Sequence, residues 1–283
     1  MIRSIRIPAL LVLALSMMLV LAACGGGEEN GGGEGTSGGG GNTTGGSTMG
    51  GASSGETITV ASDIAYRPFE FSEGGEPTGF DIDLMNEVGK RAGFQVEYQN
   101  VAFDGIIGGL GSNLYDAAIS AMTITPERDE QIDFSDPYFN ADQSLLVPAD
   151  SDIGAVGDIA DSTVGVQIGT TGASKAEEFA EAGDITGDIR TFDTIEDAFA
   201  ALENGQVDAI INDLPVSQDK ANKSDGALEI VETIPTEEQY GIAFPTDSEL
   251  TSPVNDALKE IKDDGTYAKI YEKWIGVEPE QIP

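Results

Sequence analysis

The chain has 283 residues, with 14 lysine and arginine residues against 50 aspartate and glutamate residues, which gives a formal net charge of −36. It contains no histidine and a single cysteine, Cys24. These counts exclude Ser-His-Asp triads, Cys-His dyads, histidine-ligated zinc sites and internal disulfides. The charge also argues against nucleic-acid binding, because phosphate contacts need clustered basic side chains.

The N-terminus has the composition of an export signal. Arg3 and Arg6 precede an apolar run over 7–23, which at about 17 residues is short for a membrane-spanning helix. The run ends in the sequence LAAC, which resembles the bacterial lipobox, where the cysteine is lipidated. We therefore expect a lipoprotein signal peptide over 1–23 and a lipid on Cys24. An ordinary signal peptide, or a signal anchor with an incidental cysteine, is the alternative.

The segment after the cysteine is rich in glycine. Residues 25–55 include 16 glycines among 31 residues, with serine, threonine, asparagine and a few glutamates. Such a composition cannot bury enough apolar surface to order itself. We expect a disordered tether over 24–56, with a mean reach of about 30 Å, between the anchor and a globular body.

From residue 57 onward, predicted strands alternate with predicted helices. Short apolar runs predict strands over 58–61, 94–98, 116–120, 164–167 and 207–211. Asp81 can cap a helix that ends at Gly93, and Thr194 with Asp197 forms a capping box for a helix that ends at Gly205. Shorter helical patterns occur over 104–110, after the GTTG turn at 169–172, from residue 252 and over 267–274.

This alternation predicts an α/β fold with mostly parallel sheets, in which ligands bind at the carboxyl ends of the strands. Polar side chains follow four of the predicted strand ends. Arg128 can hold a carboxylate in a bidentate fork, and the turn at 169–171 offers main-chain N–H groups to an anion. Asp213 offers the opposite charge to an ammonium group. A cation and an anion at different strand ends suit a zwitterion.

Each of these features also has a purely structural interpretation. Arg128 can pair with its acidic neighbours at the surface, and Asp213 can cap the next helix. The GTTG turn is not a P-loop, because no Gly-Lys-Ser/Thr sequence follows it. Asp81 and Asp83 do not continue into an EF-hand loop, so we expect no calcium or other metal site.

Seven stretches of the body together resemble the extracellular solute-binding proteins, family three, of ABC importers for polar amino acids. They are VASDIAYRPFEF (60–71), GFDIDLMNEVGKRAG (79–93), AFDGIIGGL (102–110), DAAISAMTITPERDEQIDFSDPYF (116–139), VGVQIGTTG (164–172), NGQVDAIINDLP (204–215) and DGTYAKIYEKWIG (264–276). The segment EEQYGIAFP (237–245) is most similar to glutamine-binding members, whereas VGVQIGTT (164–171) is more similar to arginine-binding ones.

The resemblance implies a two-lobed periplasmic-binding-protein type II fold that closes around its ligand. Each lobe is then a mostly parallel sheet flanked by helices. Lobe 1 takes residues 57–138 and 241–283, and lobe 2 takes residues 143–236. Two crossing segments, 138–142 and 236–240, form the hinge.

The resemblance also implies which residues hold the α-amino acid group of the ligand. These residues are Ser120, Ala121, Thr123, Arg128, Thr171 and Asp213. Arg128 holds the carboxylate with help from the two threonines. Asp213 holds the α-ammonium, with main-chain help near Ser120 and Ala121.

The side chain of the ligand is expected to meet a second set of residues. Tyr66 and Phe103 enclose its aliphatic stem, while Asp63, Gln167 and Asn212 face its far end. Glutamine-binding members often carry a basic residue where Gln167 stands, and a histidine can stand where Asn212 is, so the ligand stays open. Two neutral amides leave one acid at this end, which ranks glutamine slightly ahead of arginine, with lysine and histidine behind.

The expected function is therefore extracytoplasmic capture of a polar L-amino acid, glutamine or a basic one such as arginine, and its delivery to the permease of an ABC importer. We expect a non-catalytic monomer without a cofactor, anchored by its lipid at the cell surface or the periplasmic face of the bacterial membrane. An enzyme similar to cyclohexadienyl dehydratase on the same scaffold, or a sensory ligand-binding module, is the alternative.

Overall fold

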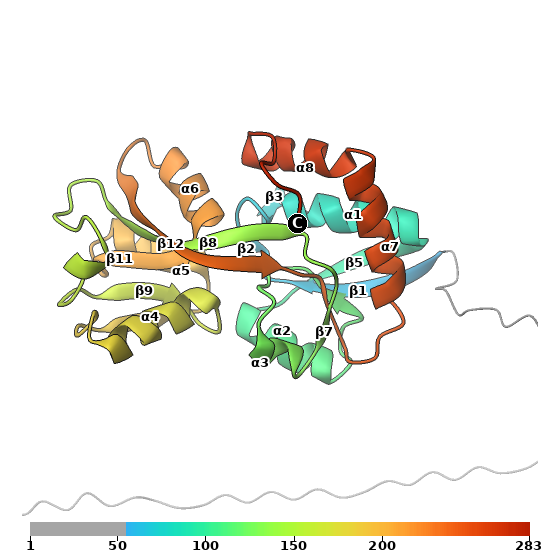
Figure 1. Ribbon diagram of the computed structural model, residues 1–283, viewed down its shortest axis with the longest axis horizontal. Helices are drawn as coiled ribbons and strands as arrows, with labels where there is room; N and C mark the ends of the chain where they lie inside the picture. The colour runs from blue at the N-terminus through green and yellow to red at the C-terminus, as the bar shows by residue number, and fades with distance from the viewer. Residues whose placement is uncertain (1–54) are drawn as a thin grey trace, which may run out of the picture. The chain divides into compact units, whose positions relative to one another are not determined.

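The computed structural model describes residues 55–283, so the predicted signal peptide, Cys24 and the tether up to residue 54 lie outside the described residues. The described part contains two five-stranded sheets, a small three-stranded sheet and the helices that flank them (Figure 1). None of the helices in residues 55–283 is both long and apolar enough to cross a membrane.

The first sheet is built from both ends of the described chain. Its strands, in order across the sheet, are β5 (Phe94–Asn100), β1 (Glu56–Ser62), β6 (Ala117–Ala118), β13 (Ala243–Phe244) and β7 (Asp133–Phe134). β1 pairs in parallel with β5 and β6, and β13 pairs antiparallel with β6 and β7. Four of the five strands therefore run in one direction, as the sequence predicts.

Helices cover both faces of this sheet (Figure 1). They are α1 (Phe80–Ala92), α7 (Thr251–Asp263) and α8 (Thr266–Ile275) on one face, and α2 (Phe103–Gly111) and the short α3 (Pro126–Asp129) on the other. A hairpin sheet of β2 (Ala65–Tyr66), β3 (Glu70–Glu73) and β4 (Glu76–Thr78) precedes α1.

The predicted cap of α1 is wrong. The helix begins at Phe80, and the N-cap residue is Gly79, which has no side chain to offer. Gly79 has φ +136°, and a Cβ on it would lie 2.0 Å from the main-chain oxygen of Phe69, so only glycine fits there. This close approach turns Asp81 inward, where its carboxylate accepts a hydrogen bond from Ala121 N (2.8 Å).

The second sheet has the same kind of order. Its strands are β10 (Ile189–Phe192), β9 (Val164–Gln167), β11 (Ala209–Asp213), β8 (Phe139–Pro148) and β12 (Leu228–Tyr240). β8 runs antiparallel to both of its neighbours, and the other four strands share one direction. The flanking helices are η1 (Val156–Asp158), α4 (Thr171–Ala182), α5 (Ile195–Glu203) and α6 (Leu214–Lys223). The predicted cap of α5 is confirmed, because Asp197 N donates to Thr194 Oγ1 (3.2 Å).

Strands β8 and β12 pass from the second sheet to the first (Figure 1). Their antiparallel pairing shifts register between Ile234 and Glu238 and then continues to the pair of Tyr240 with Phe139. Tyr240 also forms an isolated bridge with Thr123, beyond the first sheet. The predicted hinge segments, 138–142 and 236–240, lie at the start of β8 and at the end of β12, where these two strands pair.

An aromatic cluster holds the crossing strands against the first sheet. The Phe139 ring stacks on Tyr240 and on Tyr271 of α8, with ring centroids 5.6 and 5.4 Å apart. Phe80 and Tyr267, both fully buried, pack edge to face at 5.9 Å. Burial of such rings contributes more than area alone. The aromatic residues of the last helix therefore serve the core, as their spacing predicts.

Candidate functional site

One cavity lies where β1, β6, β9 and β11 end, which is the edge that the sequence predicts. Its lining residues are Asp63, Tyr66, Glu70, Phe103, Ser120, Ala121, Thr123, Arg128, Gln167, Thr170, Thr171 and Asp213. Every predicted ligand-binding residue except Asn212 is among them. Glu70 lines the cavity although the sequence pattern did not predict it, and Thr170 belongs to the predicted turn.

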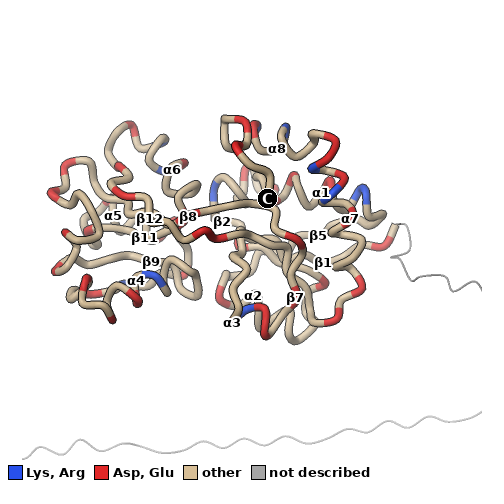
Figure 2. Tube along the Cα trace, viewed as in Figure 1, with Lys and Arg blue, Asp and Glu red and all other residues tan. Residues whose placement is uncertain are grey.

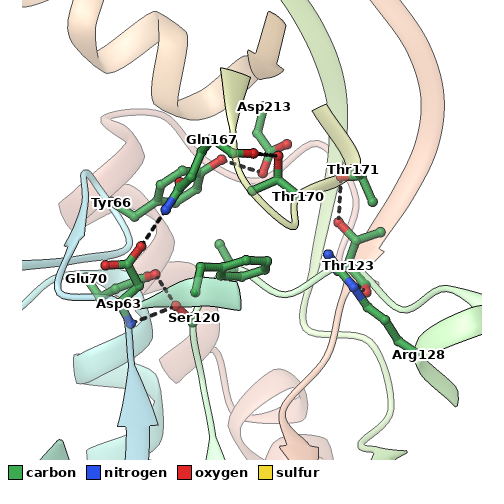
Figure 3. A pocket seen from close by; sticks show the side chains of 12 residues that line it. Asp63, Tyr66, Glu70, Ser120, Thr123, Arg128, Gln167, Thr170, Thr171 and Asp213 are labelled. Carbon is green, nitrogen blue, oxygen red and sulfur yellow. Dashed lines mark hydrogen bonds between the residues drawn. The ribbon is translucent and has the colours of Figure 1, made fainter. Parts of the chain in front are cut away.

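The charged side chains occupy different sides of the cavity. Figure 3 shows Asp63 and Glu70 near Ser120 on one side and Arg128 on the opposite side, while Asp213 lies beyond them with Tyr66. A molecule held here therefore meets a cation at one end and carboxyl groups elsewhere.

Arg128 belongs to α3, a single helical turn that begins with proline and is capped by Thr125. Its side chain is 7 % exposed, and it donates to the main-chain oxygens of Thr123 (2.7 Å) and Gly169 (3.1 Å). Burial lowers the pKa of Arg128, and the nearby Asp213 opposes that effect. The guanidinium has five N–H donors, so donors remain for a ligand anion. The surface-pairing alternative is therefore not what the structure shows.

Asp213 is the buried acid at the end of β11. It accepts hydrogen bonds from the hydroxyls of Tyr66 (2.9 Å) and Tyr240 and from the side-chain amide of Gln143. Burial raises the pKa of Asp213 to about 6, and the charge of Glu238 adds to the rise. Asp213 is the N-cap residue of α6, but its side chain makes no capping hydrogen bond, so the capping alternative does not account for it.

Asp63 and Gln167 meet across the cavity from the two sheets. Gln167 Nε2 donates to Asp63 Oδ2 (2.6 Å) and to the main-chain oxygen of Asp193 (3.1 Å). Burial raises the pKa of Asp63 to about 6, the amide of Gln167 acts against that rise, and the charge of Asp104 adds to it. This pair forms the end of the cavity at which the resemblance places the ligand side chain.

Glu70 lies beside Asp63 on the short strand β3. Ser120 Oγ donates to Glu70 Oε1 (2.8 Å) and accepts from Asp63 N (3.0 Å), so one serine links the two acids. Glu70 is fully buried, and burial raises its pKa well above the usual value, with the charge of Asp81 as the next cause. An acid between two phenylalanines in the sequence PFEF is the one signal that could have found it.

Two predicted residues make contacts that differ from their expected roles. The hydroxyls of Thr123 and Thr171 both donate to Glu238 Oε2, each at 2.8 Å, so their protons are already engaged. Glu238 lies on the crossing strand β12. The threonines therefore connect the two sheets through this carboxylate.

Asn212 is not among the residues that line the cavity. Its side chain is buried, and Asn212 Oδ1 lies 3.0 Å from the hydroxyl of Tyr66. The same hydroxyl lies 2.9 Å from Asp213 Oδ2, so Asn212 contacts a lining residue without itself lining the cavity.

The GTTG turn is shaped for close approach. Gly169 has φ +77°, and a Cβ on Gly172 would lie 2.9 Å from the main-chain oxygen of Ile211. Thr170 caps α4 by accepting from Ala173 N (3.1 Å), which leaves the N-terminus of this helix at the cavity. The N-terminal end of a helix favours negative charge.

The lining therefore carries three acids, Asp63, Glu70 and Asp213, against one base, Arg128. The excess of acid is also a property of the whole described part, where acidic positions follow most elements and basic positions are few (Figure 2). In the cavity, however, all four groups are buried, so the charge of each group that is ionised is screened only weakly.

Comparisons with known proteins agree with this architecture. The family model of the bacterial extracellular solute-binding proteins, family 3, matches residues 58–277. The arginine-binding extracellular protein ArtP of Bacillus subtilis is 36 % identical over 229 residues, which cover 80 % of this chain and 89 % of that protein.

Two solved structures show the same fold. The arginine-, lysine-, histidine-binding protein ArtJ of Geobacillus stearothermophilus has a TM-score of 0.74 and 38 % identity, covering 80 % of this chain and 97 % of its own. The ancestral amino acid-binding protein AncCDT-1, a precursor of cyclohexadienyl dehydratase, has a TM-score of 0.70 and 40 % identity, covering 77 % and 95 %. The chain thus belongs to the bacterial extracellular solute-binding proteins, family 3, and has their two-lobed type II fold.

Proposed function

We propose that this protein captures a basic L-amino acid, with arginine the preferred ligand, and delivers it to an ABC importer. The observation that carries the proposal is the charge of the cavity: two acids, Asp63 and Glu70, lie opposite its single base, Arg128, with Asp213 as a third acid. Arginine carries two positive groups and one negative group, which is the complement of this lining.

The expected pose follows from these positions. The ligand carboxylate takes the free N–H groups of Arg128 and the N-terminus of α4, and the α-ammonium takes Asp213. The guanidinium then reaches Asp63 and Glu70. Tyr66 and Phe103 line the cavity between these ends, where aromatic faces suit an aliphatic stem and a flat cation.

Glu70 reverses the ranking that the sequence favours. Asp63 alone leaves glutamine and arginine nearly balanced, since a neutral amide can satisfy one carboxylate. A second buried acid at the same end can form an ion pair with the guanidinium of arginine, whereas the neutral amide of glutamine offers it no opposite charge. Glutamate is excluded most strongly, because buried like charges in contact cost several kcal/mol.

A thermal-shift series on the purified protein tests the proposal. Arginine, citrulline, lysine, glutamine and glutamate are compared at equal concentration, because a ligand that binds only the folded state raises the melting temperature by an amount that grows with the logarithm of its affinity. Citrulline is the matched control, since it has the shape of arginine with a neutral urea group. We expect arginine to give the largest shift, lysine a smaller one and glutamate none.

Two outcomes contradict the proposal at different levels. A larger shift with citrulline or glutamine than with arginine shows that the acids of the cavity do not select a cation. No shift with any of the five ligands shows that the site does not bind these amino acids at all.

We further propose that capture occurs by closure of two lobes, 57–138 with 241–283 and 143–236, about the segments 138–142 and 236–240. Support comes from hydrogen bonds that join the two sheets across the cavity, such as Arg128 to Gly169 and Gln167 to Asp63. Thr123 and Thr171, one from each proposed lobe, also donate to Glu238 in the proposed hinge segment 236–240, and these hydrogen bonds stabilise the closed arrangement.

The site is proposed to bind without catalysis. Its relatives are named for binding, although one structural neighbour is a precursor of a dehydratase. Each cavity acid already accepts a hydrogen bond from a protein group, which suits ionic recognition. Recovery of unchanged arginine after prolonged incubation supports binding without catalysis, and chemical conversion of arginine contradicts it.

We also propose that the protein is a monomer held at the outer face of the membrane by a lipid on Cys24.

A further inference from the structure

Two buried acids at one side of the cavity, Glu70 and Asp81, form a pair. Both side chains are 0 % exposed, and Glu70 also lines the cavity. The tight approach at Gly79 brings the first turn of α1 against β3, where Asp81 N donates to the main-chain oxygen of Phe69 (2.9 Å). The fold thus places two carboxyl groups side by side away from water.

The hydrogen bonds of the pair are incomplete unless it holds a proton. Glu70 Oε1 accepts from Ser120, and Asp81 Oδ2 accepts from Ala121 N and from the Tyr138 hydroxyl, each at 2.8 Å. Glu70 Oε2 and Asp81 Oδ1 are buried and receive no donor. Each carboxyl group perturbs the pKa of the other, so the two groups lie close together. A proton on the pair supplies the donor that two carboxylates lack, because neither carboxylate has a hydrogen to give.

Within residues 55–283, no positive charge is among the groups that face this pair. The titratable groups that face it are one further acid and a set of neutral hydroxyls: Asp63, Tyr66, Tyr98, Tyr138 and Tyr267. Burial raises the pKa of Asp81 to about 6 and that of Glu70 well above its usual value. Geometry and electrostatics therefore agree that the pair retains a proton near neutral pH.

We propose that Glu70 and Asp81 share one proton, and that a cationic ligand side chain entering beside Glu70 expels it to solvent. This inference rests on the proposed binding of a basic amino acid. The O–H bond of the pair breaks, the proton passes to water or buffer, and the ligand cation takes over its role of balancing the charge. Ligand capture is thereby coupled to proton release, and Glu70 determines specificity by changing its charge.

The coupling fixes the direction of the pH dependence. Below the titration range of the pair, arginine must displace a proton, so its affinity rises with pH by up to about tenfold per unit. Above that range the pair is already ionised and the affinity becomes constant. Citrulline has no cationic side chain, so it releases no proton from the pair, and the titration of the pair does not change its affinity.

Calorimetry of the purified protein in two buffers of different ionisation enthalpy measures the protons released. Near pH 7, we expect the binding of arginine to release up to about one proton more per bound ligand than the binding of citrulline does. Asp63 and Asp213 also have pKa values of about 6, so the series extends from about pH 6 to about pH 9. Release that persists above pH 7 then belongs to the pair.

Three variants separate the pair from the other acids. Asp81→Asn places a permanent amide donor against Glu70 Oε2, so arginine binding should lose its proton release and become stronger at low pH. Glu70→Gln removes both the proton and the charge, and arginine should bind at least about tenfold more weakly. Glu73→Gln changes an exposed acid on the same strand and should match the wild type.

Several results overturn the inference. Arginine that binds tightly at every pH without proton release refutes the shared proton but leaves the proposed function standing. Failure of arginine to bind refutes the proposed function itself. Undiminished release in Asp81→Asn assigns the proton to another group. Should Asp81→Asn fail to fold, the wild-type comparison of arginine with citrulline decides alone.

Discussion

The Arg128→Ala variant is expected to lose at least about 100-fold in affinity for arginine. In the structure, two N–H groups of Arg128 go to Thr123 and Gly169, which leaves a fork for the ligand carboxylate. Two charge-assisted hydrogen bonds at about 1.5 kcal/mol each amount to about 3 kcal/mol, and about 1.4 kcal/mol corresponds to tenfold in affinity. Arg128→Lys should recover only part, because an ammonium lacks the planar fork.

The assay is calorimetry with arginine and with agmatine, which is arginine without its carboxylate. If Arg128 holds that carboxylate, removing either partner removes the same interaction, so Arg128→Ala should weaken agmatine far less than it weakens arginine. Arg190→Ala is the matched control, because Arg190 is an exposed arginine on β10. Near-native affinity for arginine in Arg128→Ala, or equal losses for both ligands, would refute the assignment.

Three further predictions concern the side-chain end, the fold and the N-terminus. Asp63→Asn should weaken arginine by at least about tenfold and glutamine much less, since it removes a counter-charge but keeps an acceptor; tighter binding of glutamate than of either ligand by the wild type contradicts the position of Asp63. Gly79→Ala should lower the melting temperature by more than about 6 °C, because its Cβ meets Phe69 O at 2.0 Å, whereas Gly74→Ala, with open space around its Cβ, should lower it less. Cys24→Ser should release the protein into the medium with ligand affinity unchanged, and retention of this variant in the membrane fraction contradicts a lipid as the sole attachment.

Local sequence was enough for β1, β5, β6, β9 and β11, for most of the helices and for the edge at which the site forms. Hydrophobic periodicity predicted these elements, because the period of an element is set by its own backbone geometry. It did not predict β8, β10, β12 or α6. The rule that parallel strands end at a common edge then brought together Asp63, Arg128, Gln167 and Asp213, which lie far apart in the chain. The capping box at Thr194 was readable for the same reason, since its partners are three residues apart.

Tertiary structure decided the residues whose surroundings come from distant segments. Asp81 resembles a helix cap in the sequence, but it turns inward because Gly79 packs against the main chain of β3. In the sequence, Glu70 is typical of a side chain on one face of a short strand. In the structure it accepts a hydrogen bond from Ser120 and lies near Asp81, and it is the second acid at its end of the cavity. Burial and the position of charged neighbours follow from three-dimensional packing, and they set both the protonation of a carboxyl group and the charge of the ligand that it selects.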